Sequence, residues 1–221
     1  MKAKRARERR PCAGPHLERL LWRVGITHVA GVDEVGMGPL AGPVVAAAVV
    51  LPVEAGVRGV ADSKQLTAEQ RERLDLDIRA CALAIGIAEV DVDDIDRLNI
   101  YHAAMKAKRL AIAALAPLVP GFVLVDGREI PGIGIPQSAY PKGDAFVLSI
   151  AAASIVAKVH RDGVMRRLED LHPGYGFGRH MGYATAAHRR ALHERGPSPV
   201  HRRSFAPLAS TVQLPLQGLS R

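Results

Sequence analysis

The order of hydrophobic and polar residues predicts four β-strands. Four short apolar blocks are bounded by Gly, Pro or Asp, which is the pattern of strands separated by turns. The second block is almost uninterrupted, as expected for a strand that is buried on both faces. The predicted strands cover residues 29–35, 43–51, 84–90 and 121–126.

Other segments place apolar residues at the three- and four-residue spacing of helices. The predicted helices cover residues 67–80, 93–116, 144–171 and 185–195, after a short amphipathic helix before residue 25. Thr67 is a candidate N-cap, and Gly196 follows the last helix at a position that favours glycine. The mixture of strands and helices predicts the α/β fold class, with a mixed β-sheet flanked by α-helices.

Length, composition and charge indicate one domain with basic ends. With 221 residues, 48% of them hydrophobic, the chain can build one core. We expect a basic extension at residues 1–25, a folded domain at 26–207 and a tail at 208–221. Residues 1–10 carry six Lys or Arg and one Glu, residues 179–203 carry six Arg and one Glu, and the formal net charge is +8. The part between these basic segments is therefore slightly acidic, which suits a phosphate-binding enzyme with an acidic metal site.

The composition also predicts where the protein works. No stretch reaches the roughly 18 apolar residues that a membrane-spanning helix needs, and the basic N-terminus lacks the apolar core of a secretory leader. The two cysteines, Cys12 and Cys81, form no CxxC motif, which argues against a disulfide framework or a structural zinc site. We expect a cytoplasmic monomer with no membrane partner.

Two adjacent acids, Asp33 and Glu34, interrupt the first apolar block. Neighbouring residues of a strand point to opposite faces, so one carboxylate is directed to a covered face of the sheet. A buried carboxylate is costly unless a cation or hydrogen-bond donors lie close to it. The alternative is a strand-end pair that faces solvent.

Two further acids stand where α/β proteins place their sites. Asp126 ends the fourth predicted strand, although alone it could be an ordinary Asp-Gly turn. Asp144 opens the predicted helix 144–171, where it could simply be the N-cap. Four such carboxylates brought together would suit Mg²⁺ or Mn²⁺, and a pair of these ions about 4 Å apart can activate water and stabilise the leaving oxygen of a phosphodiester. The chain has no GxxxxGK[ST] and no GxSxG motif, which disfavours triphosphate and serine-nucleophile chemistry.

The helix predicted at 144–171 carries a polar stripe on an otherwise apolar face. At about 100° per residue, Ser154, Lys158 and Asp162 lie towards one side. We take Ser154 and Lys158 as candidates for contact with a backbone phosphate. Asp162 is expected to pair with Arg166, four residues further on.

A glycine-rich turn and a late aromatic stretch are candidates for substrate contact. Gly36, Met37 and Gly38 directly follow the acid pair, and paired glycines let a backbone approach a ligand closely. Such a loop can read the 2′-hydroxyl groups that an A-like helix displays in its minor groove. Residues 174–183 hold three of the eight Phe and Tyr residues; we assign Tyr183 to the substrate and expect the other two to be packed.

From about residue 28 to 207 the sequence resembles the ribonuclease HII family, the bacterial type 2 ribonucleases H. The segments that carry the resemblance are VAGVDEVGMGPLAGPVVAAAVVLP (29–52), DSKQL (62–66), FVLVDG (122–127), KGD (142–144), AAASIVAKVHRD (151–162), HPGYGFGRHMGYAT (172–185) and HRRSF (201–205). Each alone is moderately specific, whereas seven in the same order are very specific.

The resemblance implies an RNase H-like catalytic domain and a two-metal mechanism with Mg²⁺ or Mn²⁺. It implies hydrolysis of the RNA strand of RNA–DNA hybrids and incision 5′ of single ribonucleotides in duplex DNA, leaving 3′-hydroxyl and 5′-phosphate ends. The implied roles are ribonucleotide excision repair and RNA primer removal. The implied catalytic and metal-binding acids are Asp33, Glu34, Asp126 and Asp144. The implied substrate contacts are Gly36, Met37, Gly38, Ser63, Lys64, Ser154, Lys158 and Tyr183.

Three positions depart from the family pattern. Met37 stands where the family usually has Arg, Met181 where it usually has Lys, and Ala61 where it often has Asn. Because the loop at 36–38 is expected to act through its backbone, recognition should survive while phosphate affinity weakens. We expect the salt dependence of binding to be shallower by about one unit per lost contact.

Other interpretations predict different features. A ribonuclease HIII would need an extra N-terminal substrate-binding domain, for which residues 1–27 are too short. A resolvase-like nuclease on the same fold would share the acids but lack the glycine turn and the Gly-Tyr pair. A non-catalytic nucleic-acid-binding module is the alternative from another class, and it makes all four acids incidental.

Overall fold

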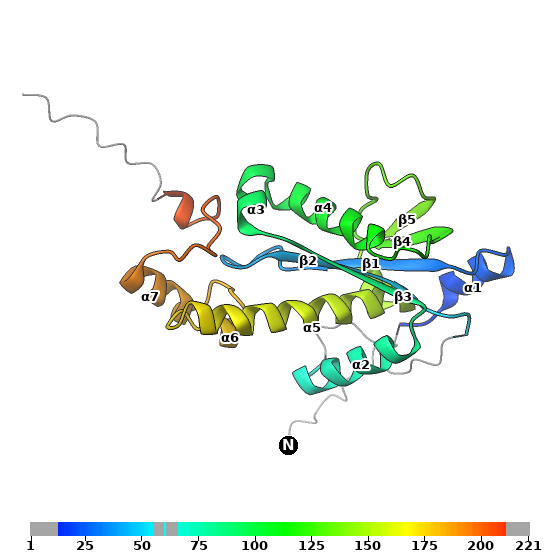
Figure 1. Ribbon diagram of the computed structural model, residues 1–221, viewed down its shortest axis with the longest axis horizontal. Coiled ribbons are helices and arrows are strands. Elements are labelled where there is room, and N and C mark those ends of the chain that lie inside the picture. Colours follow the sequence, from blue (N-terminus) through cyan, green and yellow to red (C-terminus); the bar gives the residue numbers. More distant parts are fainter. Residues whose placement is uncertain (1–12, 55–59, 61–65, 211–221) are drawn as a thin grey trace, which may run out of the picture.

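The computed structural model describes residues 13–54, 60 and 66–210, which include a five-stranded sheet between helices (Figure 1). The strands are β1 (Val29–Val35), β2 (Val44–Val50), β3 (Ala84–Val90), β4 (Phe122–Asp126) and β5 (Gln137–Tyr140). Their spatial order is β3-β2-β1-β4-β5. β1 pairs antiparallel with β2 and parallel with β4, so the predicted mixed sheet is confirmed.

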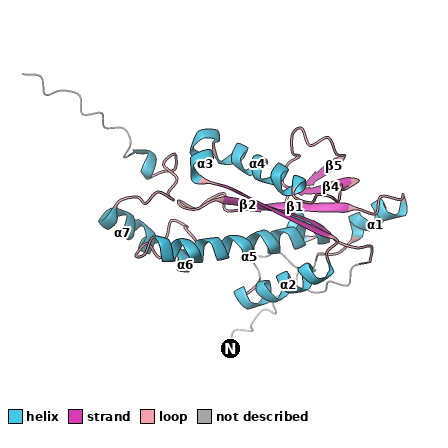
Figure 2. Cartoon of the chain, viewed as in Figure 1, coloured by secondary structure: helices cyan, strands magenta, loops and turns pink. Residues whose placement is uncertain are grey.

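Helices pack on both faces of this sheet, which gives three layers (Figure 2). α3 (Val92–Leu98) and α4 (Ile100–Ala113) lie on one side, and α5 (Leu148–Leu171) with α2 (Ala68–Cys81) lie on the other. The remaining elements are α1 (His16–Arg23), α6 (Phe177–His180), α7 (Ala186–Arg195) and the 3-10 turns η2 (Gly143–Ala145) and η3 (Leu208–Ser210). Within the described ranges, no helix is long and apolar enough to cross a membrane.

The centre of the sheet is built from small apolar residues. β2 is buried along its whole length, and its side chains alternate between the cluster with α4 and the cluster with α5. In β1, Gly31 allows α5 to approach closely, because a methyl group there would lie 2.0 Å from the backbone carbon of Ser149. The start of α5 is therefore held against β1, two residues before Asp33.

The short helix α1 fixes the same end of α5. Glu18 is 3% exposed, and its Oε1 accepts hydrogen bonds from the Ser149 N–H at 2.8 Å and from the Ser149 hydroxyl at 2.7 Å. Val147 offers no side-chain cap to α5, so Glu18 supplies an acceptor for its first turn.

The domain boundaries proposed from the sequence stay predictions.

Most predicted elements are confirmed, and two predicted helices need correction. The helix expected at 93–116 is two helices, because Asn99 adopts a φ of 67° and its side chain accepts from the His102 N–H at 3.1 Å, which starts a new helix. The helix expected from residue 144 begins only at Leu148, and Asp144 lies in the preceding turn η2 rather than at an N-cap. Neither β5 nor α6 was predicted.

Candidate metal centre and substrate surface

Three of the four predicted acids converge at one edge of the sheet. β1 and β4 run parallel, with Val32 beside Val125, so the next residues, Asp33 and Asp126, lie at adjacent carboxyl-terminal strand ends. Ligand oxygens of Asp33, Glu34 and Asp126 all lie within 4.8 Å of one another. The parallel register of β1 and β4 thus brings together Asp33 and Asp126, which are 93 residues apart in sequence.

Asp33 points towards α5. Its side chain is buried, with 5% of the residue exposed, and the Ser154 hydroxyl of α5 is a hydrogen-bond partner. Burial, followed by repulsion from Glu34 and Asp126, raises the pKa of Asp33 well above its usual range, while Lys108 and Ser154 oppose the rise. Without a bound cation, these surroundings therefore disfavour the ionised form of Asp33.

Glu34 points to the other face, towards α4. Its Oε2 lies 2.5 Å from the Lys108 ammonium, whose side chain is 1% exposed. The same ammonium donates a hydrogen bond of 2.8 Å to the backbone carbonyl oxygen of Asp126. The prediction that adjacent acids separate to opposite faces is confirmed, and the α4 face supplies a buried cation that the sequence analysis did not identify.

The fourth acid, Asp144, stands beside the cluster without belonging to the 4.8 Å group. The preceding N–H, that of Gly143, donates to Asp126 Oδ1 at 2.7 Å, which joins turn η2 to the end of β4. Asp144 is itself buried, with 6% exposed. Its place is therefore next to Asp126, on the turn that leads into α5.

The donor set fits a divalent cation. The cluster offers only carboxylate oxygens, which are the ligands that Mg²⁺ and Mn²⁺ favour. Glu34 Oε2 is buried and receives no aligned hydrogen bond in spite of its ion pair with Lys108. A buried carboxylate oxygen in this state retains a free lone pair that a cation can use.

The buried side chain of Arg202 binds the backbone of the glycine turn that follows β1. Gly36 has a φ of 97°, a conformation that side chains rarely adopt. Arg202, with 0% exposed, donates to the carbonyl oxygens of Gly36 at 2.6 Å, Met37 at 3.2 Å and Gly42 at 2.8 Å. The turn is thus a fixed backbone surface.

A second buried arginine ties this turn to the aromatic stretch. Arg161 of α5 donates to the carbonyl oxygens of Pro43 at 2.9 Å, Ala41 at 3.1 Å and Met181 at 3.0 Å. The turn and the stretch also share a backbone hydrogen bond, from the Leu40 N–H to the Gly182 carbonyl. These contacts bring two segments together that are about 140 residues apart in sequence.

Tyr183 lies beside the glycine turn. It is 45% exposed, and a methyl group placed on Gly38 would lie 3.8 Å from its ring. The other two aromatic residues of the stretch, Tyr175 and Phe177, belong to an internal cluster, as predicted. The exposed ring and the glycine backbone therefore form one continuous surface next to the acids.

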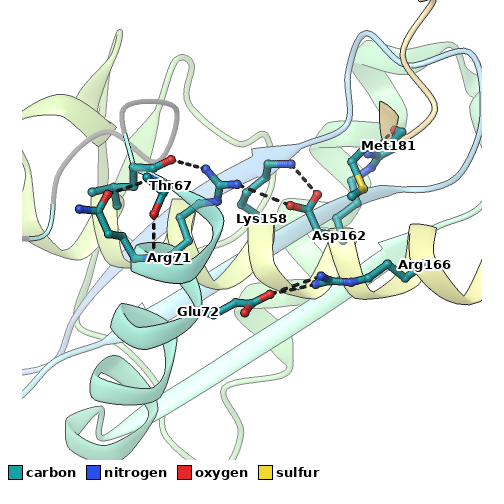
Figure 3. Close-up of polar contacts among 10 residues, drawn as sticks. Thr67, Arg71, Glu72, Lys158, Asp162, Arg166 and Met181 are labelled. Carbon is teal, nitrogen blue, oxygen red and sulfur yellow. Dashed lines mark hydrogen bonds and ion pairs between the residues drawn. The ribbon is translucent and has the colours of Figure 1, made fainter. Parts of the chain in front are cut away.

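Lys158 and Asp162 line a recess between α2 and α5 (Figure 3). Asp162 is paired with Lys158 at 2.5 Å and with Arg71 of α2 at 4.0 Å. The predicted pair of Asp162 with Arg166 is wrong, because Arg166 reaches across to Glu72 of α2 at 3.2 Å. The Lys158–Asp162 pair lies within α5, whereas α2 supplies the partners Arg71 and Glu72.

The other predicted contacts have varied surroundings. Met37 packs against the core cluster of α4, and Met181 packs in a separate cluster with Met165 and Phe177. Ser154 is 6% exposed, and its predicted phosphate contact stays a prediction beside its contact with Asp33. The predicted contacts Ser63 and Lys64, and the departure at Ala61, lie outside the described residues.

Sequence reasoning did not single out three buried cations. Lys108 is one of two lysines in a helix that reads as amphipathic, so only its contact with the sheet distinguishes it. Arg161 and Arg202 fall inside segments 151–162 and 201–205, which carry the family resemblance but no acid–base or metal-ligand pattern that marks these two residues. A basic residue inside an otherwise apolar helix face was the available signal for Arg161.

Comparisons with known proteins agree with this geometry. The family called Ribonuclease HII matches residues 30–208. A ribonuclease HII of Anaeromyxobacter sp. (strain Fw109-5) is 53% identical over 199 residues, 90% of this chain but 63% of that protein. One of Paracidovorax citrulli (strain AAC00-1) is 55% identical over 84% of this chain and 77% of that protein. The structure of the PCNA:RNase HII complex from Archaeoglobus fulgidus contains a chain that superposes with a TM-score of 0.69 at 28% identity, over 79% of this chain and 93% of that one.

The mixed sheet and these relatives define the class as a metal-dependent endoribonuclease of the ribonuclease H type. The carboxylate cluster lies where two parallel strands of this sheet end. Within that class, the chain belongs to the ribonuclease HII family.

Proposed function

We propose that this chain hydrolyses the RNA strand of RNA–DNA hybrids and incises 5′ of single ribonucleotides embedded in duplex DNA. The observation that carries the proposal is the convergence of Asp33, Glu34 and Asp126 within 4.8 Å, beside a fixed glycine backbone and an exposed tyrosine. A nucleic-acid-binding module would have no use for a buried carboxylate whose pKa is raised by burial and by two neighbouring carboxylates. We further propose a cytoplasmic, monomeric enzyme.

The four acids would hold two divalent ions, Mg²⁺ or Mn²⁺. When bound, such ions supply an activated water and stabilise the leaving oxygen. Asp33 and Glu34 would contribute from the two faces of β1, and Asp126 and Asp144 from the end of β4 and from turn η2. Residues Gly143 and Lys108 would position Asp126 through its side chain and its carbonyl oxygen, respectively. Cleavage that frees a 3′-hydroxyl and leaves a 5′-phosphate follows from this proposal.

Recognition of the ribonucleotide would come from the turn at 36–38 and from Tyr183. Backbone groups of the turn would contact the 2′-hydroxyl, and the Tyr183 ring would stack on the neighbouring sugar. Arg161 and Arg202 act indirectly, since they bind the backbone that makes these contacts. Such selectivity suits the first cut of ribonucleotide excision repair and the removal of RNA primers.

The recess between α2 and α5 would hold the phosphate backbone of the duplex. Its volume is about 210 Å³, and its lining includes four cationic side chains and two acidic ones. The cationic residues are Arg71, Lys158, Arg166 and Arg179. Asp162 keeps Lys158 and Arg71 together, so the excess positive charge is held at one place.

The test is a labelled duplex that carries one ribonucleotide, incubated with and without Mg²⁺ or Mn²⁺, with the product ends mapped. We expect one cut on the 5′ side of the ribonucleotide, only with a divalent ion, and none with the Asp126→Asn variant. That variant should still bind the duplex. Asp170→Asn, an exposed change on α5, is the matched control. Metal-independent cutting, or full activity of Asp126→Asn, would overturn the proposal.

A further inference from the structure

Lys108 places a positive charge inside the proposed metal site. Its residue is 1% exposed, and it is the only lysine among the buried residues of the described part of the chain. Its neighbours on the same face of α4, Ala104, Ala107 and Ala111, belong to the apolar core. An isolated ammonium in such surroundings would be strongly unfavourable. Glu34, 2.5 Å away, and the carbonyl oxygen of Asp126, 2.8 Å away, are its two partners.

These two partners make the position of the ammonium specific. The contact with the Asp126 carbonyl oxygen does not depend on any carboxylate, so the backbone anchors the ammonium at the end of β4. The contact with Glu34 engages the carboxylate oxygen that otherwise has no aligned partner. One lysine therefore contacts two of the proposed metal-site residues, Glu34 and Asp126.

We propose that Lys108 is a built-in counter-ion that sets the affinity of this site for divalent cations. In the ion-free protein it offsets the mutual repulsion of the carboxylates and holds Glu34 in place. When a divalent ion binds, it competes with the ammonium for Glu34 and is repelled by its charge. This inference rests on the proposed function, because it assumes that the acids hold metal.

Removal of the Lys108 charge should have opposite effects on the stability of the ion-free protein and on its affinity for divalent ions. Loss of the ammonium leaves the acid cluster uncompensated in a mostly buried place, so the ion-free protein becomes less stable. The same loss removes a repulsive neighbour and frees Glu34, so divalent ions bind more tightly. A purely structural lysine would give the first effect without the second.

The experiment measures Mn²⁺ binding directly, from the electron paramagnetic resonance signal of free Mn²⁺, in the full chain without substrate. Lys108→Met keeps the length of the side chain and removes its charge. We expect its dissociation constant for Mn²⁺ to fall at least about tenfold relative to wild type. Lys106→Met is the matched control, since Lys106 lies on the same helix and pairs with Asp94 away from the acids. Its affinity should stay within about twofold of wild type.

Thermal unfolding gives a second readout. Without metal, Lys108→Met should unfold at a lower temperature than wild type, and saturating Mn²⁺ should raise its Tm by more than it raises that of wild type. Unchanged or weaker Mn²⁺ binding by Lys108→Met would overturn the inference. If this variant does not fold, the Glu34→Gln/Lys108→Met double variant decides, because the loss of both charges should restore folding; failure to do so would also overturn it.

Failure of the inference can be told from failure of the proposed function. If wild type binds Mn²⁺, Asp126→Asn binds it much more weakly, and Lys108→Met matches wild type, only the role of Lys108 is wrong. If wild type and Asp126→Asn bind Mn²⁺ equally, the acids do not form a metal site, and the proposed function and the inference both fail.

Discussion

The acid cluster and the proposed substrate surface, which consists of the turn at 36–38 and Tyr183, lie side by side but are held in place differently. Asp33 and Asp126 are positioned by the parallel register of β1 and β4. The backbone at 36–38 is instead held by the side chain of Arg202, about 165 residues along the chain. Strand register is shared by many hydrogen bonds, whereas the turn depends on a few. The two regions should therefore respond differently to mutation.

The two regions also differ in how they contribute to the stability of the protein. Burial and the repulsion from Glu34 and Asp126 raise the pKa of Asp33, so this carboxylate lowers the stability of the ion-free protein. Arg202 and Arg161 satisfy carbonyl oxygens that would otherwise be buried without partners, so they add to stability. The acid cluster thus lowers the stability of the ion-free protein, whereas the contacts that hold the turn at 36–38 raise it.

The largest expected effect separates activity from stability in the acid cluster. Asp33→Asn should lower kcat on the order of a thousandfold or more, because one proposed metal ligand loses its charge. The same change should raise the Tm of the ion-free protein, since it removes a buried carboxylate that Glu34 and Asp126 repel. Parallel kinetic and calorimetric measurements test both effects. A fall in Tm would mean that the ionised Asp33 has a structural role.

Arg202 should show the opposite behaviour. Arg202→Met leaves the carbonyl oxygens of Gly36 and Gly42 without their donor, so the free energy of unfolding should fall by about 3 kcal/mol. KM should rise because the turn at 36–38 loses its support. Urea unfolding and steady-state kinetics measure the two effects. Arg203→Met, at an exposed neighbour, should change neither the free energy of unfolding nor KM. Equal effects of the two variants would contradict the proposal that Arg202 holds the turn at 36–38.

The sequence could predict the features of the site that depend on local pattern, but not those that depend on contacts between distant elements. Asp33, Glu34 and Asp126 could be predicted from local pattern, because acids at or near the end of an apolar strand are visible in the sequence. The break at Asn99 was missed because its positive φ is a feature of one residue in an otherwise helical pattern. Lys108 was missed because its partner lies on another element, and no spacing in the sequence reports such a contact. Side-chain contacts between distant elements were the unpredictable part.

Mild acid should weaken the substrate surface through two histidines. Burial and the neighbouring His188 lower the pKa of His201 to about 4, whereas it is about 6.5 in an unfolded chain. His201 Nδ1 accepts from the Ser198 N–H, so its Nε2 donates to His188 Nε2 at 3.0 Å, and His188 Nδ1 donates to the Tyr183 carbonyl oxygen. Protonation of His201 at Nδ1 removes the lone pair that accepts from the Ser198 N–H, so this contact requires the neutral ring.

The lowered pKa of His201 determines the direction in which stability changes with pH. The unfolded state binds the proton more tightly, so this contribution to stability is complete above about pH 6.5 and is lost as the pH falls from there to about 4. Urea unfolding across that range should show the loss, and His201→Gln should show a smaller pH dependence. An unchanged slope in the variant would assign the acid sensitivity to other groups.

Tyr183 should affect recognition without affecting stability. Its ring is 45% exposed, so Tyr183→Ala should leave Tm unchanged. Loss of stacking should raise KM for a single-ribonucleotide duplex by about tenfold, and Tyr183→Phe should retain most of the affinity. Tyr101→Ala, at a similarly exposed ring on α4, is the control. A fall in Tm would show that the ring supports the fold.

The smallest effect concerns the two methionines that replace expected cations. Met37 and Met181 pack in different apolar clusters, so their effects should be independent and should add. Met37→Arg and Met181→Lys should each steepen the plot of log affinity against log salt concentration by about one unit, if each new charge reaches a phosphate. Met181 lines the recess with Lys158 and Arg179, so its replacement by lysine adds charge where cations already gather. If KM and its salt dependence stay unchanged in the double variant, neither side chain faces the duplex, and the recess has to hold the phosphate backbone with the cations that it already contains.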